Sequence, residues 1–194
     1  MCYGLSKRKQ QPYDVSYLEG RMMFSAPLAI TLTAPTTPQA VGVIIPVSIA
    51  VRNISDRRLR MVGVLDGLET GFRYPHYLPV ITGPQPLPPP EGLGRCGNVA
   101  RLRLEDFRDL NPGESFDPTV PQREEAYVSL VTFADFRPLF PGRYELRLTL
   151  STESQRGEDW LGLLEFPGKE LVLAQLAEVP RLRVESNVAV VEVQ

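Results

Sequence analysis

The segment Leu110–Phe116 reads LNPGESF, and a second turn of the same kind opens the segment Phe140–Leu150, FPGRYELRLTL. In both segments Pro-Gly stands before a run in which apolar and polar residues alternate. Proline presets the first position of a type II turn, and glycine accepts the positive φ that the second position requires. Alternation with a period of two is typical of a strand with one buried face. The two segments therefore predict strands entered through tight turns, with Gly113 and Gly142 at positive φ.

The same alternation recurs along most of the chain, and helical spacing is found in one window. That window is Lys169–Glu178, where Leu171, Val172 and Leu176 fall on one helical face that Val179 continues before Pro180. The predicted strands are Leu28–Thr33, Val47–Arg52, Arg58–Leu65, His76–Thr82, Val99–Phe107, Ala126–Phe133, Tyr144–Leu150 and a strand or strand pair in Arg181–Gln194 that is broken near Glu185–Asn187.

These patterns predict an all-β fold, an immunoglobulin-like antiparallel β-sandwich of about seven to nine strands with long loop insertions. One short helix is expected within Gly168–Val179. The inward phase of the strands predicts the core residues Leu32, Val47, Ile49, Val51, Tyr144, Leu146, Leu148 and Val190.

The composition fits one globular domain. The chain has 194 residues, of which 43% are hydrophobic and 23% charged, which is enough apolar material for a core. We expect residues 1–26 to be an N-terminal extension and residues 27–194 to form a single domain, with insertions at about 66–98 and 153–180. A formal net charge of -2 gives no basic field for a polyanion, so nucleic-acid binding is not expected.

The sequence contains no recognisable transmembrane segment or signal peptide. No window reaches the roughly 18 apolar residues of a membrane span. The start, MCYGLSKRKQQ, has no apolar core behind its charges, which predicts a cytoplasmic protein. Whether residues 1–21 belong to the native start is left open. Two cysteines, Cys2 and Cys96, make no disulfide framework and are expected to be free thiols, with one bridge between the N-terminal tail and the Cys96 loop as the alternative.

The common catalytic motifs are absent from the sequence. The chain contains no GxxxxGK[ST], HExxH, GxSxG or GxGxxG, and its one histidine is His76. Metal sites and proton relays commonly use more than one imidazole, and this sequence has only one. We therefore predict a protein that is not an enzyme, without cofactor or metal.

A proline-rich loop is the longest irregular segment that the sequence predicts. Five of the seven residues from Pro84 to Pro90 are proline, which fixes φ and removes strand hydrogen-bond donors. Such a stiff loop loses little entropy on binding, or it covers a sheet edge instead. Phe72 and Trp160 are further aromatic candidates for a recognition patch or for the core. The predicted partner-binding residues are Tyr74, His76, Tyr77, Pro86, Pro88 and Pro89.

The order of these features resembles a loose group of bacterial immunoglobulin-like accessory domains that includes the intracellular proteinase inhibitor family. The residues that carry the resemblance are IPVSIAVRNISDRRLRM (45–61), LNPGESF (110–116), PGRYELRLTL (141–150) and ESNVAVVEV (185–193). The resemblance implies a two-sheet antiparallel sandwich without cofactor, either free-standing or appended to another domain. No position matches a known inhibitory site, and the two insertions depart from the inhibitor pattern.

Three functions follow as hypotheses, because sandwiches of this kind serve several purposes. The first is a non-catalytic interaction or accessory module that binds another protein through loops at one end. The second is a proteinase inhibitor. The third is a hydrolase without a recognised motif, or a carbohydrate-binding module.

Overall fold

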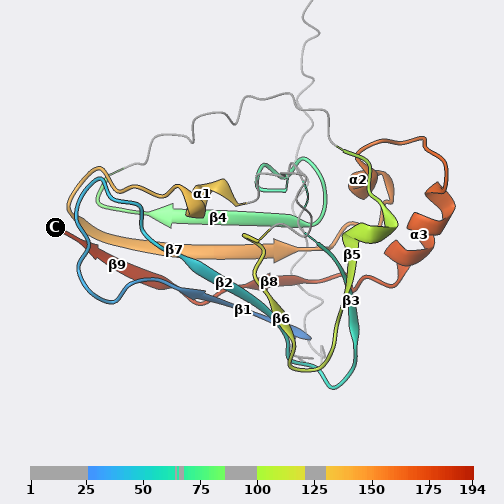
Figure 1. Ribbon diagram of the computed structural model, residues 1–194, viewed down its shortest axis with the longest axis horizontal. Coiled ribbons are helices and arrows are strands. Elements are labelled where there is room, and N and C mark those ends of the chain that lie inside the picture. The colour runs from blue at the N-terminus through green and yellow to red at the C-terminus, as the bar shows by residue number, and fades with distance from the viewer. Residues whose placement is uncertain (1–25, 64, 66–67, 86–99, 121–129) are drawn as a thin grey trace, which may run out of the picture.

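A computed structural model describes residues 26–63, 65, 68–85, 100–120 and 130–194, and its elements are mainly antiparallel strands (Figure 1). The all-β class is therefore confirmed. The elements are β1 (Leu28–Thr33), β2 (Ser48–Asn53), β3 (Leu59–Val62), β4 (His76–Thr82), η1 (Leu104–Asp106), β5 (Phe107–Leu110), β6 (Ser115–Phe116), α1 (Val131–Ala134), β7 (Gly142–Ser151), α2 (Glu158–Leu161), α3 (Lys169–Ala177), β8 (Arg183–Glu185) and β9 (Ala189–Val193).

The longest strand, β7, organises the largest sheet. Its alternating run buries Tyr144, Leu146, Leu148 and Leu150, as the sequence predicts. All seven residues of strand β4 pair with one edge of β7. On the other edge β9 pairs with the first half of β7 and β8 with its last three residues. The predicted C-terminal strand pair, broken near Glu185–Asn187, is thus confirmed.

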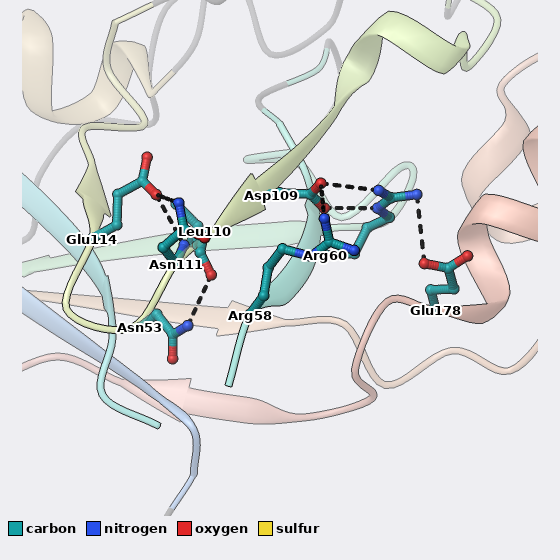
Figure 2. Close-up of polar contacts among 8 residues, drawn as sticks. All are labelled: Asn53, Arg58, Arg60, Asp109, Leu110, Asn111, Glu114 and Glu178. Carbon is teal, nitrogen blue, oxygen red and sulfur yellow. Dashed lines mark hydrogen bonds and ion pairs between the residues drawn. The ribbon is translucent and has the colours of Figure 1, made fainter. Parts of the chain in front are cut away.

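A second part of the fold is a bent ribbon in which β2–β3 runs antiparallel to β5–β6. Strand β2 pairs with β6, and β3 pairs with β5. The bend lies at Asn53, which is fully buried. Its backbone N–H donates to Glu114 and its carbonyl accepts the N–H of Gly113, at 2.9 Å each. Its side-chain nitrogen donates to the carbonyl of Arg57 at 2.8 Å. It also donates to the carbonyl of Leu110 at 2.9 Å (Figure 2).

The first Pro-Gly turn closes this bend. Gly113 has φ +79°, and the carboxylate of Glu114 accepts the backbone and side-chain N–H groups of Asn111 (Figure 2). In the second Pro-Gly turn, Gly142 has φ +139°, and an added Cβ would lie 3.0 Å from a side-chain carbon of Pro84. Both predicted positive φ angles are confirmed, so each glycine occupies backbone that other residues rarely adopt.

Strand β1 connects the ribbon to the large sheet. It pairs with β2, and it also lies beside β7 and β8. The side chain of Asn187, between β8 and β9, accepts the N–H of Leu32 at 2.8 Å and donates to its carbonyl at 3.0 Å. One buried hydrophobic cluster contains residues of β1, β2, β3, β4, β5, β7 and β9. Of the predicted core residues, Leu32, Ile49 and Val51 are buried and Val47 is half-buried against that cluster.

Two strand predictions are wrong because local hydrogen bonds override the alternation. The predicted strand Val99–Phe107 contains the 3-10 turn η1, and β5 begins only at Phe107. There the Asp106 carboxylate accepts the backbone N–H of Arg103 at 2.8 Å, and Leu102 donates its N–H to the carbonyl of Leu161, the last residue of α2.

The predicted strand Ala126–Phe133 ends in a helix. Residues 126–129 lie outside the described part of the chain, while Val131 begins the short helix α1. Leu130 takes a left-handed conformation with φ +50° before it. The Glu69 carboxylate accepts the N–H groups of Val131 and Thr132 at 3.1 Å each, which satisfies donors that a helix start leaves open.

The predicted helix is confirmed as α3, but it is accompanied by the single turns α1 and α2. Val172, Leu176 and Val179 are buried on its inner face, whereas Leu171 is 62% exposed. The core prediction for Val190 is also wrong. In β9 the residues Ala189, Val191 and Val193 point inward, because the break at Asn187 resets the phase that alternation would carry over from β8.

The phase of β9 can be tested with two neighbouring valines. Val191 is fully buried and Val190 is 38% exposed. We expect Val191→Ala to lower the free energy of unfolding by about 2 to 3 kcal/mol, through lost burial and a residual cavity. Val190→Ala should cost less than about 1 kcal/mol. Urea denaturation measures both, and equal losses for the two variants would contradict the assigned phase.

Candidate functional site

One end of the molecule is built by α2, α3 and the segment 100–106, on the right in Figure 1. Arg73 holds these parts together. Its side chain is almost fully buried and donates to the carbonyls of Ala100 and Trp160, the latter at 2.6 Å. Because both acceptors are backbone groups of distant segments, Arg73 fixes the segment 100–106 beside α2.

Trp160 is the aromatic centre of this end. It is fully buried, and its indole N–H donates to the carbonyl of Ser154 at 3.2 Å. The Arg181 guanidinium lies 4.8 Å from its ring centroid and donates to the carbonyls of Leu176 and Val179. Cations near a helix C-terminus stabilise it. Trp160 is therefore a core residue that positions α3.

The structure separates the predicted partner-binding residues. Tyr74 and His76 are half-buried, and their rings stack with centroids 3.8 Å apart. Tyr77 is fully buried, so its side chain is not available to a partner at the surface. Pro86, Pro88 and Pro89 lie outside the described residues, as do Cys2 and Cys96. Binding through Tyr74 and His76 stays a prediction.

Tyr77 belongs to the buried hydrophobic cluster of the core. Burial raises the pKa of its hydroxyl far above the ordinary value. Its hydroxyl and the Nε of Arg108 are buried and have no hydrogen-bond partner among the described residues. The Arg108 guanidinium lies 4.3 Å from the ring centroid of Phe116. Arg108 therefore brings a positive charge, partly desolvated, close to the tyrosine.

His76 lies near a serine and a carboxylate without forming a proton relay with them. The hydroxyl of Ser154 donates to the Asp159 carboxylate at 2.6 Å. A Ser-His-Asp relay needs that hydroxyl on the imidazole. Burial lowers the pKa of His76, and the charge of Asp159 opposes this shift. The arrangement favours a neutral imidazole that packs on Tyr74.

A cavity of about 220 Å³ lies at the same end of the molecule. One wall is the segment 101–105, and the other is the segment 166–172, which contains the start of α3. Leu104 and Leu171 are 49% and 62% exposed, so the lining includes apolar side chains in contact with solvent. Arg101 places its guanidinium 5.8 Å from the ring centroid of Phe166, which also lines the cavity.

An ion-pair network attaches α3 to the ribbon (Figure 2). Arg60 binds the Asp109 carboxylate through two nitrogens, at 2.8 and 3.0 Å, and lies 3.5 Å from Glu178 just after α3. Arg58 also approaches Asp109, at 3.2 Å. The hydrogen bonds from Arg60 hold the pKa of the Asp109 carboxyl below its ordinary value. These contacts link β3, β5 and α3, and so help to position the cavity wall.

The opposite end of the molecule carries a patch of exposed apolar side chains. They come from the loop between β1 and β2 and from the segment that leads into β7. Their exposed fractions range from 39% to 55%. This apolar end patch consists of Val41, Val43, Ile44, Leu139 and Phe140.

No group of three or more histidine, cysteine, aspartate or glutamate side chains in the described ranges could hold a metal ion. Within the same ranges, no helix is long and apolar enough to cross a membrane. Comparison with protein-family models, curated proteins and solved structures finds no match. The case for a function therefore comes from the geometry of the two ends.

Sequence reasoning missed the cavity and the end patch. The cavity combines segments about 60 residues apart, and neither segment carries a motif. The end patch had a weak signal in VGVII (41–45), an apolar run without a clear alternation. Such a run predicts a buried strand as readily as an exposed loop.

We expect the single histidine to titrate below its ordinary pKa of about 6.5. The folded state then binds the proton less well than the unfolded chain. The folded protein is therefore more stable above about pH 6.5, where His76 is neutral, and its free energy of unfolding decreases as the pH falls through that value. Asp159→Asn should lower the pKa of His76 further, because it removes the carboxylate that favours the imidazolium. NMR titration of the imidazole protons measures both, and a pKa above 6.5 in the native protein would refute this account.

Proposed function

We propose that this chain is a non-catalytic protein-interaction module, an immunoglobulin-like β-sandwich that binds another protein through loops at one end. The observation that carries the proposal is the apolar end patch. Its five exposed apolar side chains come from two loops that backbone hydrogen bonds join, and exposed apolar surface of this kind is typical of protein-binding surfaces. Loops held by a rigid sheet scaffold are a common place for such surfaces.

A tyrosine contact supports the immunoglobulin-like assignment. Tyr144 lies near the start of β7, and its hydroxyl donates to the carbonyl of Phe140, four residues upstream, at 2.8 Å. A tyrosine that bonds back to the chain before its own strand is a frequent feature of Greek-key sandwiches. The same bond fixes the segment that carries Leu139 and Phe140.

Backbone hydrogen bonds hold the two loops of the patch together. Gly42 donates to the carbonyl of Pro138 at 2.8 Å, and Ile45 donates to that of Phe136 at 3.0 Å. Gln39 exchanges backbone bonds with Glu192 and Gln194 in and after β9. A patch that is ordered before binding loses less conformational entropy in a complex.

The border of the patch indicates the chemistry of the partner. Arg137 belongs to the segment that leads into β7, and its guanidinium reaches the carbonyl of Gly42 in the other loop at 3.5 Å. It forms no ion pair with another described residue. The proposed partner therefore presents an apolar surface bordered by a carboxylate, because opposite charges at the rim of an interface favour encounter and correct register.

The other two hypotheses remain without a specific structural argument. Among the described residues, no contact favours a proteinase inhibitor, a hydrolase or a carbohydrate-binding module over the interaction module. The interaction module has the patch and its rigid support in its favour.

A pair of matched double variants tests the proposal. Val43→Lys with Leu139→Lys places two charges in the patch, at residues that are 41% and 55% exposed. Val80→Lys with Val188→Lys is the control, at residues of β4 and beside β9 that are 50% and 41% exposed. Affinity capture followed by calorimetry with the purified partner should show binding at least about tenfold weaker for the patch variant only.

Both variants should keep the native melting temperature, because all four side chains are exposed. Equal affinity of the patch variant and the control for the partner would refute the proposed surface. Sedimentation velocity covers a further outcome. If the native chain forms a dimer that only the patch variant abolishes, the occupant of the patch is a second copy and not a different protein.

A further inference from the structure

The cavity between the segments 101–105 and 166–172 is small and mixed in character. Its volume of about 220 Å³ lies below the range of pockets that enclose drug-sized ligands. It can take about one large side chain or a short acid. Its apolar lining includes Leu104, Phe166, Leu171 and Val172. An occupant therefore needs a compact apolar group.

The charge beside the cavity is positive. Arg103 and Glu105 form an ion pair at 3.4 Å, so together they add little net charge. Arg101 makes no ion pair with any described residue, and its guanidinium is oriented by the Phe166 ring. A guanidinium held over an aromatic ring still presents its edge N–H groups to a carboxylate.

The start of α3 adds to this field. Gly168, at φ +83°, precedes the nine-residue helix, and no side chain caps its first turn. The N–H groups of Lys169 and Leu171 donate to the carbonyls of Phe166 and Gly168, and the positive end of the helix dipole attracts negative charge. Glu170, in this first turn, is not among the residues that line the cavity. Arg101 is the main source of positive charge at the cavity, and the helix end adds to it.

We infer that this cavity binds the C-terminal residue of a polypeptide whose last side chain is apolar, with its carboxylate on Arg101. A single apolar side chain suits the volume, and a terminal carboxylate suits Arg101, which has no ion-pair partner among the described residues. The exposed faces of Leu104 and Leu171 extend the apolar surface at the cavity, where the preceding residue of the peptide would pack. This site is at the opposite end of the molecule from the apolar end patch and does not depend on it.

Three probes test the site in the full chain by NMR titration. They are the peptide acetyl-Gly-Ala-Leu with a free carboxylate, the same peptide as its C-terminal amide, and 4-methylpentanoate. The free peptide should produce saturable methyl shifts at Leu104, Leu171 and Val172. The amide should bind about tenfold more weakly, because it loses the charge-assisted hydrogen bonds to Arg101. The small acid should also bind more weakly, because it lacks the contacts of the preceding residues.

Variants of the arginine distinguish recognition from packing. Arg101→Gln should weaken binding of the free peptide about tenfold and abolish its advantage over the amide. Arg101→Lys should restore part of that advantage. Arg57→Gln, the same change at an exposed arginine of the turn between β2 and β3, should leave all affinities unchanged.

Several results would overturn the inference. They are the absence of saturable shifts at the cavity residues, equal affinity for the free peptide and its amide, and an equal loss for both ligands in Arg101→Gln. If 4-methylpentanoate binds as tightly as the peptide, the occupant is a small apolar acid, and the polypeptide assignment is wrong.

Discussion

The side-chain amide of Asn53 is the interaction on which the arrangement of the ribbon depends. It donates to the carbonyls of Arg57 and Leu110 and accepts both the N–H and the hydroxyl of Ser55, at 2.7 to 2.9 Å. Its backbone continues the ladder to Gly113 and Glu114. A buried polar group is costly unless it is satisfied, and here every bond is made at the point where the two ladders meet. Asn53 therefore fixes the bend between them.

This bend sets the register on both of its sides. A shift by one residue would turn the inward side chains of β2 and β3 toward solvent, since successive strand residues face opposite ways. Asn187 makes a comparable contact at the edge of β1, where its side chain occupies both backbone groups of Leu32. Two asparagines thus join segments that are far apart in the sequence. The strands of the two parts run between the two ends of the molecule. One end has the loops with the apolar end patch, and the other has α2, α3 and the cavity.

Much of the fold could be predicted from the sequence because most strands have one buried face. The strands at Leu28–Thr33 and His76–Thr82 were predicted with the bounds that the structure gives, and α3 lies inside its predicted window. The errors occur where a single side chain decides the backbone. Asp106 and Glu69 make such contacts, and neither has a periodic signal. The candidate sites were harder to predict, because the cavity and the patch are formed by segments that meet only after folding.

The most direct test of this account compares two asparagines of the same bend. Asn53→Ala removes the side-chain donor of the buried Leu110 carbonyl and leaves the Arg57 carbonyl with the Ser55 hydroxyl, whereas Asn111→Ala removes only exposed contacts with Glu114. The free energy of unfolding in urea should decrease by at least about 3 kcal/mol for Asn53→Ala and by less than about 1 kcal/mol for Asn111→Ala. A loss below about 1 kcal/mol for Asn53→Ala would contradict the claim that this amide fixes the bend.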